Sequence, residues 1–143
     1  MTRKMTIAVA QSGAVQKNDP REANVARLCK MMADAADQGA DLVVFTEIAL
    51  TTFFPRWYAE DRAEMDHWFE REMPNPATQP LFDLARTRKV GFYLGYGELT
   101  PDGHHFNTSI LVDKKSEIVG KYRKVHLPGH DEYDPDRGIP FST

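Results

Sequence analysis

Two charged residues, Glu47 and Lys124, lie at the ends of strand-like segments, a position from which polar side chains commonly take part in binding or catalysis. Glu47 follows the apolar run 42–45, and Lys124 closes a basic run that begins at Lys121. A carboxylate beside a buried sheet is partly removed from water, which raises its pKa and suits it to act as a general base near neutral pH. A lysine ammonium can stabilise negative charge that develops on an oxygen. Taken singly, each residue is more often a solvated surface charge, because glutamate and lysine are seldom buried.

The chain contains a single cysteine, Cys29, as a possible nucleophile. It stands beside Leu28 and Met32 on the apolar stripe of a predicted helix, where a thiol behaves as a small hydrophobic group with a raised pKa. We therefore predict a buried structural role for Cys29, which leaves the chain without an identified nucleophile. A single cysteine also cannot form an internal disulfide, which agrees with a reducing compartment.

The histidines do not have the spacing of a metal site. His104 and His105 are adjacent, so on a strand their side chains point to opposite faces. His126 and His130 are four residues apart, but Pro128 and the glycine after it prevent the helix that would align them on zinc. The sequence also has no glycine-rich loop of the kind that binds phosphate.

The first third of the chain predicts a strand, a helix and a second strand. Segments 6–10 and 42–45 are short apolar runs, and the second is typical of a strand buried on both faces of a largely parallel sheet. Between them, apolar residues recur every three or four positions, which predicts a helix from about Pro20 to Asp37. Asp19 is the expected N-cap of this helix, and Gly39 is the expected C-terminal stop.

The following residues predict two more helices and then three strands. The helices are expected over 58–71 and 78–88, because apolar residues again recur on one side. The strands cover, in order, 90–99, 105–113 and 117–122. Short turns join them, so we expect an antiparallel meander attached to the first strand–helix–strand unit. No linker or internal repeat divides the sequence, which predicts one domain over residues 1–143, or part of one.

Composition limits the kinds of partner. With 143 residues, of which 41% are hydrophobic, the chain is long enough for a core of its own. Its net charge of -3 gives no overall positive field, so the basic cluster within 114–124 is expected to be a solvated strand edge and not a nucleic-acid surface. No apolar run approaches the roughly 20 residues of a membrane-spanning helix, and the N-terminus lacks a signal peptide's apolar core. We expect a cytoplasmic protein without membrane partners.

Two segments resemble the motifs of the nitrilase, or carbon–nitrogen hydrolase, superfamily. Residues 45–50, Phe-Thr-Glu-Ile-Ala-Leu, are similar to its glutamate motif, and residues 121–127, Lys-Tyr-Arg-Lys-Val-His-Leu, to its lysine motif. The resemblance implies an α/β fold, namely the N-terminal half of an α-β-β-α sandwich, with a mixed sheet and helices on one face. It also implies a Glu-Lys-Cys mechanism with Glu47 as base and Lys124 as oxyanion stabiliser, without a metal or organic cofactor.

The same resemblance places the family's nucleophilic cysteine downstream of the lysine motif, beyond Thr143. We therefore expect these residues to form a partial domain that is inactive by itself, and we expect the whole enzyme to be a homo-oligomer. Thr46 stands where the family usually has proline before the glutamate. The turn at Glu47 is expected to be less rigid as a result.

Three further segments resemble N-carbamoyl-D-amino acid amidohydrolases. They are residues 50–57, 106–113 and 126–130. This resemblance implies a small-molecule substrate, an N-carbamoyl-D-amino acid that is hydrolysed to the amino acid, ammonia and carbon dioxide, with Asn107 and His126 as substrate-binding residues. By composition, His126 is equally well a loop histidine with local hydrogen bonds. The alternatives are another carbon–nitrogen hydrolase, such as a β-ureidopropionase or an aliphatic amidase, and a non-catalytic binding or assembly module.

Overall fold

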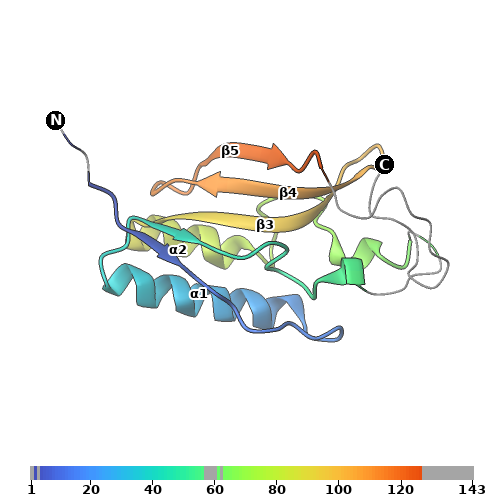
Figure 1. Ribbon diagram of the computed structural model, residues 1–143, viewed down its shortest axis with the longest axis horizontal. Coiled ribbons are helices and arrows are strands. Elements are labelled where there is room, and N and C mark those ends of the chain that lie inside the picture. Colours follow the sequence, from blue (N-terminus) through green and yellow to red (C-terminus); the bar gives the residue numbers. More distant parts are fainter. Residues whose placement is uncertain (1, 3, 57–60, 62, 127–143) are drawn as a thin grey trace.

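Five strands form one mixed sheet in the order β1-β2-β3-β4-β5 (Figure 1). The computed structural model describes residues 2, 4–56, 61 and 63–126. The strands are β1 (Ile7–Val9), β2 (Leu42–Val44), β3 (Gly91–Leu99), β4 (His105–Val112) and β5 (Ile118–Arg123). The first three strands pair in parallel, and β4 and β5 continue the sheet as antiparallel neighbours. The predicted parallel unit with an attached meander is confirmed.

The first helix, α1 (Arg21–Asp37), packs its apolar stripe against the sheet. Val25, Leu28 and Met32 are buried on this side. The helix ends at Asp37, as predicted, and Gly39 just past it has a φ of 81°, which allows the amides of residues 39 and 40 to bond the carbonyls of residues 36 and 35. The expected N-cap is wrong. Pro20 occupies the cap position, and Asp19 instead accepts a hydrogen bond from the Gln16 amide at 2.8 Å, which closes the preceding turn.

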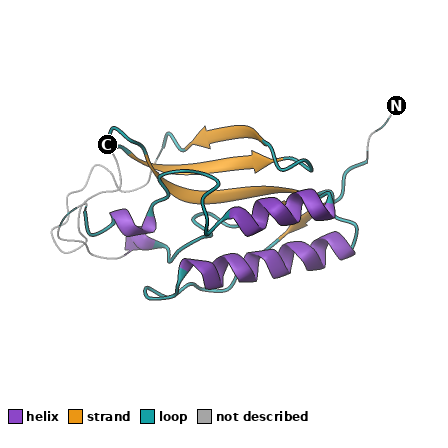
Figure 2. Cartoon of the chain, turned by 180° about the vertical axis from the view of Figure 1, so that it is seen from behind, coloured by secondary structure: helices purple, strands orange, loops and turns teal. Residues whose placement is uncertain are grey.

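The second helix, α2 (Gln79–Arg88), begins close to the predicted residue, with Pro80 in its first turn. It buries Leu81, Phe82 and Ala85 beside α1, so that both helices cover the same face of the sheet (Figure 2). Of the helices in the described part of the chain, none is long and apolar enough to cross a bilayer.

The helix predicted over 58–71 is wrong for the residues that the structure describes there. They contain only the 3-10 turn η2 (Asp66–Trp68), and another such turn, η1 (Phe54–Arg56), precedes them. Trp68 and Phe69 are buried as an amphipathic helix would require, but they pack on Phe54 in a small aromatic cluster. The backbone bonds run to the sheet instead, because the Glu70 amide donates to the carbonyl of Gly97 at 2.8 Å. Tertiary pairing therefore overrides the helical pattern.

The two faces of the sheet differ sharply in exposure. The helix-side face buries Val43, Phe92, Leu94, Ile110 and Val112 in the main core. The opposite face leaves apolar side chains in contact with solvent. Its exposed fractions include 54% for Ile7, 81% for Val9, 37% for Leu111 and 58% for Tyr122. The prediction that β2 is buried on both faces holds only for the helix side, where Val43 points, because Leu42 and Val44 on the opposite side are half-buried. We call the side of the sheet opposite to the two helices the open face.

Candidate active site

The turn that carries Glu47 lies against the middle of β3. The Phe45 amide donates to the Tyr93 carbonyl at 3.0 Å, and the Ala49 amide donates to the Gly95 carbonyl at 2.9 Å. Between these bonds, Ile48 has a φ of 48°, which is rare for a β-branched residue. A Cβ at position 95 would lie 3.1 Å from both Glu47 Cα and Ile48 N, which is tighter than most Cβ contacts, so this close approach favours glycine.

Thr46, the residue that departs from the family pattern, has a side-chain partner in the turn. Its Oγ1 lies 3.1 Å from Ser12 Oγ, in the segment that follows β1. The Ile48 side chain is buried beside Phe54 and Leu99. A hydroxyl pair on one side and apolar packing on the other thus hold the residues next to Glu47.

Lys124 and Asn107 reach Glu47 from the antiparallel part of the sheet. Asn107 lies on β4, and its carbonyl accepts a hydrogen bond from the Lys124 amide at 2.8 Å, one residue beyond the end of β5. Lys124 Nζ donates to Glu47 Oε1 at 2.8 Å, and Asn107 Nδ2 donates to the same oxygen at 2.6 Å. Among the described residues, no hydrogen bond is made to Oε2. That oxygen is the one suited to accept a proton.

The pKa of Glu47 is lowered and not raised. The hydrogen bond from Lys124 is the main cause, and Asn107 adds to it, while partial burial works in the opposite direction. The Glu47 side chain is 46% exposed, and the pKa-raising effect of its partial burial is outweighed by Lys124 together with Asn107. The sequence-based expectation of a raised pKa is therefore wrong. The consequence is a carboxylate that is ionised at neutral pH, which is the form that a general base needs.

The four predicted site residues, Glu47, Lys124, Asn107 and His126, surround one cavity of about 410 Å³ on the open face. The remaining lining residues come from the middle of the sheet: Tyr93, Gly95, Thr108, Ser109 and Tyr122. The Tyr93 hydroxyl donates to Ser109 Oγ at 2.6 Å. Sequence reasoning missed these lining residues, although alternation along the strands places most of them on the same face as Asn107.

Cys29 lies away from this cavity. It is half-buried on α1 and packs against the main core on the helix side of the sheet. Burial raises the pKa of its thiol, which lowers the fraction of reactive thiolate. The predicted structural role agrees with this position, although the burial is only partial.

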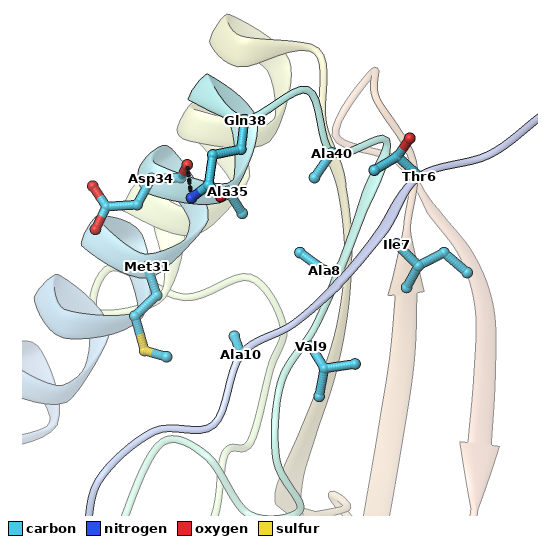
Figure 3. A pocket seen from close by; sticks show the side chains of 10 residues that line it. All are labelled: Thr6, Ile7, Ala8, Val9, Ala10, Met31, Asp34, Ala35, Gln38 and Ala40. Carbon is cyan, nitrogen blue, oxygen red and sulfur yellow. Dashed lines mark hydrogen bonds between the residues drawn. The ribbon is translucent and has the colours of Figure 1, made fainter.

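A second hollow, of about 500 Å³, lies beside the edge strand β1 and α1 (Figure 3). Its lining is mostly alanine and other apolar side chains, and Gln38 Nε2 donates to the Asp34 carbonyl at 3.1 Å across one side. The Asp34 carboxylate is paired with Lys30. Lys30 does not line this hollow, so the described residues give the hollow a carboxylate but no lining cation, unlike the cavity at Glu47. In the described ranges, no group of three or more His, Cys, Asp or Glu side chains is placed to hold a metal ion.

Comparisons with known proteins point to one family. A family model described as carbon-nitrogen hydrolase matches residues 6–140. Omega-amidase NIT2 of Homo sapiens is 27% identical over 131 residues, which cover 84% of this chain and 44% of that protein. A nitrilase of Pyrococcus abyssi is 32% identical over 104 residues, which cover 73% of this chain and 37% of that protein. The chain thus spans less than half the length of either relative.

Solved structures show the same fold. A carbon-nitrogen hydrolase from Helicobacter pylori G27 superposes with a TM-score of 0.71 at 20% identity, covering 95% of this chain and 44% of that one. Nit3 of Saccharomyces cerevisiae, a member of branch 10 of the nitrilase superfamily, gives a TM-score of 0.67 at 25% identity and covers 86% and 45% of the two chains. The predicted α/β fold, with helices on one face of a mixed sheet, is confirmed.

Proposed function

The chain belongs to the carbon–nitrogen hydrolase family, and from this membership we propose that it supplies the general base and the oxyanion-stabilising lysine for hydrolysis of an amide-type C–N bond. The observation that carries the proposal is the geometry at Glu47. Lys124 and Asn107 share Oε1, and Oε2, which has no hydrogen bond from the described residues, can accept a proton beside a cavity. Two donors, Asn107 on β4 and Lys124 just beyond the end of β5, thus converge on one carboxylate oxygen.

The proposed reaction proceeds in two halves. Glu47 takes the proton of a cysteine thiol, the thiolate attacks the substrate carbonyl carbon, and Lys124 stabilises the oxyanion. The C–N bond then breaks, and Glu47 returns the proton to the departing nitrogen, which leaves as ammonia. In the second half water attacks the acyl-enzyme, Glu47 accepts one of its protons and passes it to the departing thiolate, and the free thiol is restored. With a ureido substrate the acyl-enzyme is a thiocarbamate, and the carbamic acid that water releases loses carbon dioxide to give the amino acid.

Cys29 is not the nucleophile of this proposal. It belongs to the helix-side core, whereas Glu47 and Lys124 face the cavity on the open face. We therefore assign the thiol to a polypeptide segment that these 143 residues do not contain. The 143 residues are expected to be inactive by themselves.

The proposed substrate is an N-carbamoyl-D-amino acid, with the ureido carbonyl as the site of attack. The support is the sequence likeness of residues 50–57, 106–113 and 126–130. The Asn107 amide nitrogen is engaged by Glu47, so Asn107 would contact the substrate through Oδ1, and His126 would contact it from the rim of the cavity. A second candidate is a small substrate with a terminal, or omega, amide, for which a dicarboxylic acid monoamide is a simple probe; the likeness to a protein named omega-amidase NIT2 favours it.

The test measures ammonia release from a polypeptide that continues past residue 143 and carries the cysteine. The substrates are an N-carbamoyl-D-amino acid, its L-enantiomer, β-ureidopropionate and a dicarboxylic acid monoamide. Glu47→Gln and Lys124→Met are each expected to lower the rate by about 10²–10⁴-fold. The matched control is Lys114→Met, which removes a lysine paired with Asp41 outside the cavity lining and should keep the activity. Absence of ammonia from every substrate would refute the function, and a preference for the monoamide would refute only the carbamoyl substrate.

A further inference from the structure

Glu98 forms the centre of a polar cluster on the face of the sheet opposite to the cavity. It lies on β3 and is 7% exposed. Thr108 Oγ1 of β4 donates to its Oε2 at 2.7 Å, and Arg123 of β5 binds both carboxylate oxygens, each at 2.9 Å. Lys121 Nζ, also on β5, donates to Oε1. A single carboxylate thus joins three neighbouring strands.

The strand register explains how this cluster relates to Lys124. Thr108 is opposite Arg123, and Ile110 is opposite Lys121, so both cations lie on the same side of the sheet as the buried Ile110. Successive residues of a strand point to opposite faces. Arg123 is therefore fixed on the helix side, and its neighbour Lys124 is turned to the open face, where it meets Glu47.

Apolar packing alone holds β5 weakly. It is an edge strand, and its apolar side chains are largely in contact with solvent, with exposed fractions of 40% for Ile118, 56% for Val119 and 58% for Tyr122. Beyond its end, the Lys124 amide makes the last ladder bond to β4 within the described residues, to the carbonyl of Asn107. Strand ends of this kind fray readily. The two-pronged Arg123–Glu98 contact, with the guanidinium 4.1 Å from the Phe106 ring centroid, lies one residue before that point.

We propose that Glu98 is a positioning residue, which anchors Arg123 on the helix side of the sheet and thereby holds Lys124 against Glu47 on the open face. The importance of this role for hydrolysis rests on the function proposed above. The positional part does not, because it concerns only the contact between Lys124 and Glu47.

The pKa of Glu47 reports that contact, since the Lys124 hydrogen bond is the main cause of its lowering. The direction in which the pKa of Glu47 changes when Glu98 is substituted distinguishes the positioning effect from the direct effect of the lost Glu98 charge. Removing the Glu98 charge, with Lys121 and Arg123 left in place, would by charge alone lower the pKa of a nearby acid. Withdrawal of Lys124 from Glu47 would raise it.

The experiment follows the Glu47 side-chain carboxyl by ¹³C NMR during a pH titration of the 143-residue chain, with circular dichroism to establish that each variant is folded. Lys124→Met removes the contact completely, so the rise that it causes in the pKa of Glu47 is the reference for the other variants. Glu98→Gln is expected to produce at least about half of that rise. Lys114→Met, which breaks an ion pair at the other end of the β4–β5 hairpin, is the matched control and should leave the pKa unchanged.

Arg123→Lys is the second variant, because it keeps the charge and loses the two-pronged contact, and it carries the test if Glu98→Gln does not fold. It is expected to raise the pKa of Glu47 by a smaller amount. An unchanged or lowered pKa in the folded variants would overturn the proposal, even if both are less stable. Because no catalytic rate is measured, failure here is distinct from failure of the proposed hydrolysis.

Discussion

Glu47 depends on residues that stand 60 and 77 positions later in the chain. The sequence identified Glu47 and Lys124 through the motifs around them, and the fold brings both to one cavity together with Asn107. The direction of the Glu47 pKa was not predictable from position alone. It depends on a 2.8 Å contact with Lys124 and on incomplete burial, and neither is encoded in a local pattern.

Gly95 is the residue whose role at the site was hidden in the sequence, because it appears there only as one glycine in a strand. Gly95→Ala is expected to lower the free energy of unfolding by about 1–3 kcal/mol, since the new methyl group meets the backbone of residues 46–48 at 3.1–3.2 Å. Urea denaturation measures the loss. Gly120→Ala is the matched control, because its Cβ would meet Leu111 at an ordinary 3.6 Å, and it should stay within about 0.5 kcal/mol. Equal effects of the two substitutions would contradict this explanation.

Among the elements, those with continuous patterns were predictable. The stripe of α1 and the apolar runs of β2 and β3 place these elements within a residue or two of their observed bounds. The helix predicted over 58–71 is wrong for the described residues of that range. The spacing of Trp68 and Phe69 fits the period of a helix, but the backbone at Glu70 pairs with β3. Pairing partners distant in the sequence are what periodicity cannot reveal.

The Glu98 cluster makes the stability of the β3–β5 layer depend on pH. Burial would raise the pKa of Glu98, but hydrogen bonds from Arg123, Lys121 and Thr108 outweigh it and hold the pKa at about 2, below the ordinary 4.5. The stabilisation is therefore fully present above pH 4.5 and is lost as the pH falls toward 2. Glu98→Gln is expected to cost about 2 kcal/mol at pH 7, after discounting for cations that are partly exposed, and almost nothing near pH 2.

Urea unfolding of wild type and Glu98→Gln at pH 7, 4.5 and 2.5 measures this difference. Glu72→Gln, a substitution at an exposed position, should stay within about 0.5 kcal/mol of wild type throughout. A gap between wild type and Glu98→Gln that stays constant down to pH 2.5 would show that the carboxylate charge is not responsible.

For the molecule as a whole, the open face is the dominant feature. Solvent-exposed apolar side chains on one face of a sheet favour association, because monomers rarely leave large apolar patches uncovered. The likeness to the family had implied such a face, and the observed helix layer on one side of the sheet agrees with it. Self-association of the whole enzyme, expected from the same likeness, stays a proposal.

We expect the 143-residue chain to self-associate through the open face. The double substitution Val9→Lys with Leu111→Lys places two charges there and should shift the population toward monomer in sedimentation velocity measurements. Ala26→Lys adds a charge to the exposed side of α1 and should leave association unchanged. A wild-type chain that is monomeric and unfolds cooperatively would instead favour a self-sufficient module.

Because Arg123 and Lys124 point to opposite faces of the sheet, the number of residues in the β4–β5 hairpin decides which of them faces Glu47. Leu111 pairs with Gly120 and Val112 pairs with Ile118, so Val119 is one extra residue on β5 without a partner on β4. The face on which Lys124 emerges therefore depends on this bulge. Inserting a single residue between that point and Arg123 would move Arg123 to the position that Lys124 now occupies and would turn Lys124 to the helix side. Glu47 would then face a guanidinium in place of an ammonium, which preserves the charge but changes the group. An insertion or deletion of an odd number of residues in this part of β5 is therefore expected to turn Lys124 away from the open face, unless the bulge itself is gained or lost.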